Sequence, residues 1–572
     1  MSSNYLDEMK KIQENILEFL ESESNTENIF KNLKQIFNEI KIYDDQHKLK
    51  SLLHLLTKIA ENHRRNPNFF NKIEQILSIF KEQIKKYFSN WEIFTIFKGN
   101  KKILLFLIEE HVINIDENIA KEITTKKKYR KSKYPQYFAP EIKYLLKANW
   151  FPRYDNLIKQ INEEIPEDFY ELRKIGEEDR FICKLIQKDS IKEFIVHVNQ
   201  TNLPLTTSFE PSIYETNSFL AEKSQISLIE YAAFCGSIQI FNFLKTNGVQ
   251  IEQSLLNYSI HGKNAGIFHF CEENIKIEDN YCSLLFCENV SCIELFEESI
   301  KCHHNDFANY LLSNYAVPED LVLDYLIENY NFEFMQSNLI NEDSFLLLCK
   351  FDYYIFAEFL LKNKNIDINT IKYLSKFTAL HLAAQNDNIE IVKLLLSTPN
   401  VDVNVQSEDI IDDGKIQKGF TALHFAALNN NIEIAKLLLS TPNIDVNIQT
   451  SADGYFFERN TYFTYTALHL AVQYDNIEIV KLLLSNSNID VNIQISHDRN
   501  MRYEGYTALH IAARNNDIEI VELLLSNPHI DVNILDFRRM KAFDVTYDCE
   551  IRKLIMQRIV DDAKNVIEAL KP

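Results

Sequence analysis

The sequence predicts an all-α protein in which a solenoid of short helical repeats follows a helical N-terminal region. Four segments of 27 residues, which begin at Thr378, Thr421, Thr466 and Thr507, align without gaps. Apolar residues recur in them at spacings of three and four, which is the period of a helix. Hydrophobic residues make up 46% of the chain and charged residues 25%, so there is enough apolar side chain for a continuous core.

Each segment contains the starts of two helices. Thr378 is a good N-cap, and His381 stands three positions later, where a capping box has its reciprocal side chain. Asn388 predicts the cap of the second helix, with Glu390 in its first turn near the positive helix end. The residue before that second cap tolerates a left-handed conformation, and in the four copies it is Asp387, Asn430, Asp475 and Asn516.

The recurring histidines invite a catalytic or metal-binding interpretation, which we reject. Equal positions in successive repeats lie about one repeat width apart, too far to share one metal ion, and no copy has a Cys, Asp or Glu partner at ligand spacing. We therefore predict a structural capping role for the four pairs and no metal ligands among them. The pairs are Thr378 and His381, Thr421 and His424, Thr466 and His469, and Thr507 and His510.

The segments resemble the ankyrin repeat family. The T-A-L-H opening, the paired alanines, the I-V-K-L-L-L run and the closing D-V-N are the signature of that family. The resemblance implies two antiparallel helices and a β-turn per repeat, stacked into a curved solenoid that binds other proteins. One copy cannot bury its own apolar face, so stacking is required.

Long insertions separate the repeats. They fall at 405–420, 448–465 and 493–506, between each D-V-N and the next T-A-L-H, and we call them the first, second and third fingers. Aromatic and arginine side chains, which are typical of binding hot spots, concentrate there and on the adjoining first helices. The alternative is that these aromatics only pack on one another to order long loops. The predicted protein-binding residues are Tyr455, Phe456, Phe457, Arg459, Tyr462, Tyr474, Arg499, Arg502, Tyr503 and Arg514.

The repeats extend beyond the four clear copies. Residues 343–369 form a degenerate repeat, and 541–557 are expected to form a shortened terminal repeat that caps the array, followed by a last short helix from Asp561. Residues 224–250 follow the same plan with weaker landmarks, and 171–340 resemble an unassigned domain that often precedes ankyrin repeats in protist proteins. Residues 1–170 show helical periodicity and predict a bundle or an irregular extension of the solenoid.

Composition argues against most enzyme classes. With 10 glycines in 572 residues, the chain contains no glycine-rich phosphate loop and no G-x-S-x-G, and it has no H-E-x-x-H, kinase or deaminase pattern. We therefore expect no catalytic residue, no cofactor and no enzyme. The formal charge of −21 also disfavours nucleic-acid binding, because residues 171–572 hold 33 Lys and Arg against 57 Asp and Glu. The only dense basic run is 126–133.

The nine cysteines form no C-x-x-C pair, which indicates a reducing compartment rather than a disulfide framework. Several crowd between 235 and 302, and Cys302, His303 and His304 come nearest to a metal constellation, but we interpret these cysteines as buried small apolar residues. The start of the chain lacks the apolar core of a signal peptide, and the longest apolar run, Ile103 to Ile108, is too short to span a membrane. We expect a cytoplasmic protein, with a nuclear location as the alternative.

These observations predict three parts: a helical region at 1–170, a degenerate ankyrin-like domain at 171–342, and ankyrin repeats with a C-terminal cap at 343–572. The predicted function is a non-catalytic scaffold or adaptor that binds protein partners through the fingers and the concave surface, as a monomer. Two alternatives remain open. One is a nucleic-acid or nuclear role for the basic run 126–133, and the other is an enzyme within residues 1–340.

Overall fold

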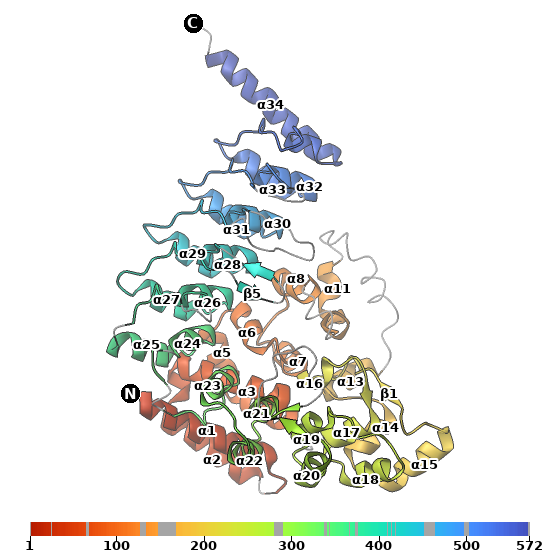
Figure 1. Ribbon diagram of the computed structural model, residues 1–572. Coiled ribbons are helices and arrows are strands. Elements are labelled where there is room, and N and C mark those ends of the chain that lie inside the picture. The colour runs from red at the N-terminus through yellow and green to blue at the C-terminus, as the bar shows by residue number, and fades with distance from the viewer. Residues whose placement is uncertain are drawn as a thin grey trace. The chain divides into compact units, whose positions relative to one another are not determined.

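The computed structural model divides the chain into two compact units, Met1–Leu339 and Ile340–Pro572 (Figure 1). The three parts predicted from the sequence, with boundaries at 170 and 342, remain a prediction. The structure describes all residues other than 1, 25, 64–67, 126–132, 147–167, 279–289, 337–339, 343, 365, 372–375, 409, 413–414, 418, 451–463, 497–502 and 570–572.

Helices dominate the described part of the first unit, and its strands pair two by two. The strands are β1 (Ser208–Phe209) with β2 (Ile226–Ser227), antiparallel, and β3 (Ile277–Glu278) with β4 (Val290–Ser291), parallel. The helices are α1 (Ser2–Glu21), α2 (Thr26–Ile40), η1 (Ile42–Asp44), α3 (Gln46–Asn62), α4 (Phe69–Ile79), α5 (Lys81–Tyr87), α6 (Asn90–Phe97), α7 (Lys101–Glu109), α8 (Glu117–Thr125), α10 (Tyr134–Tyr137), α11 (Ala139–Leu146), α13 (Phe169–Ile175), α14 (Phe181–Gln187), α15 (Ile191–Thr201), α16 (Ser218–Ala221), α17 (Leu228–Cys235), α18 (Ile238–Thr246), α19 (Leu255–Gly262), α20 (Ala265–Asn274), α21 (Cys292–Lys301), α22 (Asn305–Asn314) and α23 (Glu319–Glu328).

From α14 onward the first unit repeats a pair of short helices. The first helices of successive pairs pack on one another, α14 on α17, α17 on α19, α19 on α21 and α21 on α23. The pair α17–α18 begins with a capping box between Ser227 and Glu230 and turns at Gly236, whose φ of 69° lies in the left-handed region. This is the segment in which the sequence predicts a weak copy of the repeat.

A buried polar network joins the first helix of this unit to its last described segment. Gln13 on α1 is fully buried, and its Nε2 donates to Asn331 Oδ1 at 2.9 Å while its Oε1 accepts from the backbone N–H of Phe332 at 2.6 Å. The Asn331 amide in turn donates to Asn305 Oδ1 at 2.9 Å. Because each bond satisfies a buried polar group, the network fixes how α1 packs against residues more than 300 positions away.

The second unit is a stack of helix pairs (Figure 1). First helices pack on first helices and second helices on second helices, from one repeat to the next. Its elements are α24 (Phe345–Lys350), α25 (Tyr354–Asn363), α26 (Ala379–Gln385), α27 (Ile389–Leu396), β5 (Ile410–Asp412), β6 (Lys415–Gln417), α28 (Ala422–Asn429), α29 (Ile432–Leu439), α30 (Ala467–Gln473), α31 (Ile477–Leu484), α32 (Ala508–Asn515), α33 (Ile518–Ser526), η4 (Ala542–Asp544) and α34 (Cys549–Ala569).

The core of the stack comes from the positions that recur in every copy. Ala383 and Ala384 on α26 are fully buried, as small residues are where first helices approach closely. Ile391, Val392 and Leu395 bury the inner face of α27. The turn between the helices is left-handed as predicted, with φ of 61° at Asp387, 59° at Asn430, 56° at Asp475 and 58° at Asn516. The predicted all-α solenoid fold is confirmed.

The end of the array differs from the prediction of a shortened repeat followed by a separate short helix. A single helix, α34, runs from Cys549 to Ala569, and it packs on α33 and η4. No glycine or proline interrupts residues 549–569, so nothing in the local sequence ends the helix near Asp561, where a break is predicted.

Candidate functional site

Each first helix of the four clear repeats begins with the same threonine–histidine capping box. The backbone N–H of Thr378 donates to His381 Nδ1 at 3.1 Å, and the Thr378 hydroxyl accepts from the His381 N–H at 3.3 Å. The backbone N–H of the threonine reaches the histidine Nδ1 at 3.1, 3.1 and 3.3 Å in the next three repeats. The threonine–histidine pairs of those repeats are Thr421 and His424, Thr466 and His469, and Thr507 and His510.

Two of these histidines also bind the chain where it enters or leaves a finger. Because Nδ1 accepts a hydrogen bond, Nε2 carries the proton and donates to a backbone carbonyl: His381 to Val405 at 2.8 Å and His424 to Tyr465 at 3.1 Å. Burial lowers the pKa of His381, His424 and His469 to about 4. These imidazoles are therefore neutral at physiological pH, and His381 and His424 join their first helices to the base of a finger.

The asparagine before each second helix has a different role from the one expected. The structure shows no side-chain capping bond at Asn388, Asn431 or Asn476. Their amides donate instead to the preceding repeat: Asn388 to the Cys349 carbonyl at 2.8 Å, Asn431 to Ala384 at 2.8 Å and Asn476 to Ala427 at 2.7 Å. Only Asp517, the fourth residue in this position, caps its own helix, by accepting from the Ile520 N–H at 3.1 Å.

The closing D-V-N also ties neighbouring repeats together. Within the motif, Asp402 Oδ1 accepts from the Asn404 N–H at 2.9 Å, which bends the turn. The Asn404 side chain then bridges to the next repeat, where its amide donates to the Asn443 carbonyl at 2.7 Å and its oxygen accepts from the Asp445 N–H at 2.9 Å. The same two bonds recur at Asn369, which closes the degenerate repeat, and at Asn447 and Asn492, which close the second and third copies.

A glutamine ladder connects the bases of the three fingers. Gln406 Nε2 donates to the Gly419 carbonyl of its own finger at 3.0 Å and to the Gln449 carbonyl of the next finger at 3.0 Å. Gln449 and Gln494 each make the same pair of bonds, within their finger and to the following loop. Backbone bonds close each base, for example from the Thr450 N–H to the Tyr465 carbonyl at 2.8 Å. The described bases of the fingers are therefore bonded in sequence along one edge of the second unit.

Only three of the ten predicted protein-binding residues lie within the described residues. Arg514 on α32 and Tyr503 of the third finger come together: the guanidinium carbon lies 4.4 Å from the Tyr503 ring centroid and 6.0 Å from that of Tyr506. Tyr474 is half-buried just after α30, and burial raises the pKa of its phenol. The other seven lie outside the described residues: Tyr455, Phe456, Phe457, Arg459, Tyr462, Arg499 and Arg502.

The structure exposes apolar side chains that sequence reasoning did not select. Leu535 is 46% exposed and Phe537 55%, and both lie in the loop after the fourth repeat. The Phe537 N–H donates to the Glu504 carbonyl at 3.1 Å, so this loop is fixed against the third finger, which also carries Tyr503. On α34, Met556 and Val560 are also exposed and stand four positions apart on one helix face. That spacing is the one sequence signal that could have identified an apolar face here.

The basic run and the crowded cysteines belong to the first unit. The basic run lies outside the described residues except for Lys133, whose Nζ donates to the Pro211 carbonyl at 2.8 Å within the first unit. Cys271, Cys292 and Cys302 are buried, and Cys235 is half-buried. Among the helices that the structure describes, none combines the length and the apolar character needed to cross a membrane.

The match to a family model agrees with the repeat chemistry. A family model described as "Ankyrin repeats (3 copies)" matches residues 312–407, 345–450, 408–495 and 452–536. The chain is also similar to a solved crystal structure of an ankyrin repeat protein, at 23% identity and a TM-score of 0.30, over 38% of this chain and 98% of that one. A search of curated proteins finds no match.

Proposed function

Because this chain is an ankyrin repeat protein over residues 312–536, we propose that it acts as a non-catalytic scaffold or adaptor that binds partner proteins through its three fingers and the adjoining first helices. Ankyrin repeats are generally protein-interaction modules, and a repeat array binds through the extended surface that its per-repeat insertions build. The proposal goes further than the family does, because it assigns recognition to one edge of this array.

The observation that carries the proposal is the glutamine ladder. Gln406 and Gln449 each bond to the base of the next finger, and Gln494 bonds in the same way to the loop after the fourth repeat. A long loop that binds a partner loses conformational entropy when it becomes ordered, and prior anchoring of its base reduces that cost. The ladder therefore favours a function in which the three fingers are presented to a partner together, over one in which each finger changes position independently.

The Arg514–Tyr503 pair supports the same edge as the binding surface. Arginine and tyrosine are enriched at the energetic centres of interfaces, and here the two side chains stack beside the exposed Phe537 loop. Second helices, by contrast, carry ion pairs that face water, such as Lys436 with Glu433 at 2.6 Å. The chemistry of the two surfaces favours the finger edge for recognition.

The test is affinity capture from native lysate with quantitative mass spectrometry, comparing the full chain with a variant that lacks residues 452–462. The deletion leaves the bonded base between Thr450 and Tyr465 in place. A matched control changes the opposite surface through Glu433→Gln with Lys436→Gln. Partners lost from the deletion variant alone support the proposal. If both variants keep the full partner list, binding does not lie on the second finger, and the same deletion in the other fingers completes the test.

A further inference from the structure

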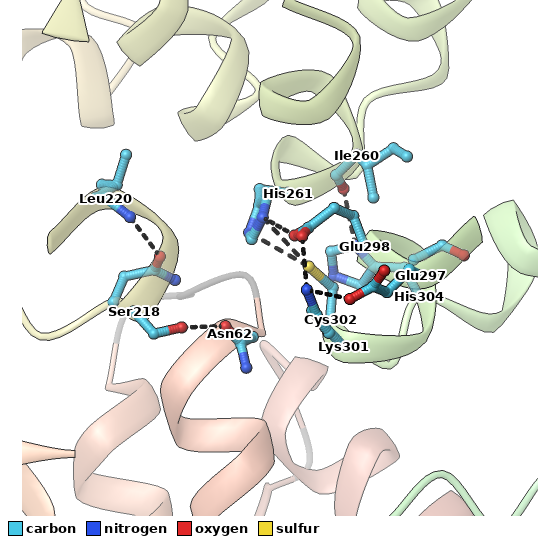
Figure 2. A network of polar contacts seen from close by, with 12 residues as sticks. Asn62, Ser218, Leu220, Ile260, His261, Glu297, Glu298, Lys301, Cys302 and His304 are labelled. Atoms are coloured by element: carbon cyan, nitrogen blue, oxygen red, sulfur yellow. Dashed lines mark hydrogen bonds and ion pairs between the residues drawn. The ribbon is translucent and has the colours of Figure 1, made fainter. Parts of the chain in front are cut away.

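In the first unit, three side chains of metal-ligand type from two different helical segments lie close together (Figure 2). Glu298 and Cys302 stand four positions apart at the end of α21, a spacing that puts both on one helix face. His261 comes from the end of α19, the helix that packs on α21. Each of the three offers one ligand atom within 4.8 Å of the others, and among the described residues no other such group forms.

The separations can be compared with those around one tetrahedral metal ion. His261 Nε2 lies 3.0 Å from Glu298 Oε2 and 3.8 Å from Cys302 Sγ. Bond lengths of ~2.0 Å to nitrogen and oxygen and ~2.3 Å to sulfur at tetrahedral angles place such ligands ~3.3 Å (N to O) and ~3.5 Å (N to S) apart. The Nε2–Oε2 separation is within a few tenths of an ångström of that value, whereas Sγ lies nearer to Nδ1, at 3.2 Å, so the Cys302 side chain has to turn towards Nε2 to complete the geometry.

Packing and hydrogen bonds hold these three residues in place. Phe219 stacks on the His261 imidazole, with ring centroids 4.2 Å apart, and so sets its plane. Lys301 Nζ donates to Glu298 Oε1 at 3.0 Å, which leaves Oε2 to face His261. The Cys302 carbonyl lies 2.7 Å from His63 Nδ1, and the Ile260 carbonyl lies 2.8 Å from His304 Nδ1. Contacts of this kind orient the ligands in metal sites.

We propose that His261, Glu298 and Cys302 form a Zn²⁺ site with three protein ligands and a fourth position left to water. Thiolate, imidazole and carboxylate together are ligands that zinc accepts. Charge balance supports the assignment, because one thiolate and one carboxylate neutralise a divalent cation in a buried place. Cys302 is fully buried and the His261 side chain 1% exposed, whereas the Glu298 side chain is 16% exposed, which gives water a route to the fourth position.

Without a metal ion, the surroundings favour an ionised Glu298 carboxylate and a neutral Cys302 thiol. Burial by itself raises the pKa of Glu298, but the hydrogen bonds and charges of His261 and Lys301 lower it to about 2, so the carboxylate is ionised. Burial and the charge of Glu298 hold the pKa of the Cys302 thiol well above its ordinary value. A bound cation reverses that balance, since a coordinating thiol loses its proton.

The alternative is a hydrogen-bonded chain in which the Cys302 thiol donates to His261 Nδ1, at 3.2 Å, and His261 Nε2 donates to Glu298. That arrangement needs no metal. Metal uptake distinguishes the zinc site from the metal-free hydrogen-bonded chain. The full chain is treated with chelator under reducing conditions, and Co²⁺ is then titrated as a spectroscopic substitute for Zn²⁺. We expect one ion per chain with a thiolate-to-cobalt charge-transfer band in the near ultraviolet, which Zn²⁺ displaces.

Variants assign the band to these residues. Cys302→Ser is expected to abolish the charge-transfer band, and His261→Gln to weaken Co²⁺ binding by more than the ~10–100-fold that loss of an outer-shell partner costs. Cys271→Ser is the matched control, because Cys271 is equally buried, on the neighbouring helix α20. The absence of a band in the folded wild type overturns the proposal. So does a band that survives in Cys302→Ser, or one that Cys271→Ser reduces as much.

Discussion

The fourth repeat departs from the others at the residue that precedes its second helix. Asn388, Asn431 and Asn476 each donate to a carbonyl of the preceding repeat, but the fourth repeat has Asp517, which has no proton to donate when it is ionised. Burial, a hydrogen bond with Asp475 and the charge of that carboxylate raise the pKa of Asp517 from 3.8 to about 7. We therefore predict that Asp517→Asn stabilises the end of the array.

The size of the effect follows from the charge and the hydrogen bond. At about 1.4 kcal/mol per unit, the pKa shift corresponds to roughly 4 kcal/mol between the two protonation states. Both carboxylates are only half-buried, so solvent screening reduces this to ~1–2 kcal/mol. A new bond from the Asn amide to the Val472 carbonyl, the equivalent of Ala384 and Ala427, adds ~1 kcal/mol. We expect a total of about 2–3 kcal/mol at pH 8.

The stabilisation expected from Asp517→Asn depends on pH, and the raised pKa of Asp517 decides whether it grows or shrinks as pH rises. A carboxyl group whose pKa is higher in the folded state than in the unfolded state supports folding at low pH, and that support is lost as pH rises through the folded value of about 7. The wild type is therefore penalised most at pH 8. At pH 5 the Asp517 carboxyl of the folded protein is largely protonated. The electrostatic part of the stabilisation by Asp517→Asn therefore falls to less than half of its value at pH 8.

Local hydrogen exchange measured by mass spectrometry is the suitable assay, because a chain of two compact units need not unfold in one step. Peptides from α32 and α33 report the opening free energy at pH 8 and, after correction for intrinsic exchange, at pH 5. The reciprocal control is Asn476→Asp, which removes the bond to Ala427 and should destabilise the third repeat. If Asp517→Asn gives no gain, or the same gain at both pH values, the account of carboxylate repulsion is wrong.

Three further predictions test other contacts. His424→Gln keeps a capping side chain but removes an imidazole whose pKa is about 4. The stability of the second repeat should therefore fall less steeply in the variant than in the wild type as pH drops from ~6.5 towards 4, as measured by hydrogen exchange of peptides from α28. Asn447→Ala removes the bonds to the Asn488 carbonyl and the Asp490 N–H, and should cost ~1 kcal/mol by hydrogen exchange; Asn443→Ala, at a position that bridges repeats through its carbonyl, should cost less. Gly262→Ala places a Cβ against the Ala233 carbonyl and should lower the melting temperature, whereas Gly266→Ala, on the neighbouring helix α20, should not; equal effects would contradict the close α17–α19 contact.

Structural features formed by residues a few positions apart could be predicted from the sequence, because the interactions that form them are local. The capping pair Thr378 and His381 spans three positions, and the left-handed turn at Asp387 depends on that residue's own tolerance. Apolar residues at three and four predicted which faces are buried, and Ala383 and Leu395 are buried as those faces require. Where the local signal was incomplete, as near Asp561, the predicted break was wrong, because α34 runs straight through it.

The bonds between repeats required the tertiary structure. Asn388 is as good a cap by sequence as Asp517, and only the position of the preceding repeat decides that its amide donates across 39 residues to Cys349. The glutamine ladder likewise depends on stacking, since Gln406 reaches a carbonyl 43 residues away.

The finger edge and the cluster of His261, Glu298 and Cys302 show the same division between what the sequence determines and what the tertiary structure decides. The sequence by itself determined the helices, the repeats and the place of the fingers, because hydrophobic periodicity and capping act between neighbours along the chain. Only the tertiary structure decided that Arg514 meets Tyr503, and that His261 meets Glu298 and Cys302. Such meetings depend on how α19 packs on α21 and how a finger folds back on α32, and no spacing along the chain encodes those distances.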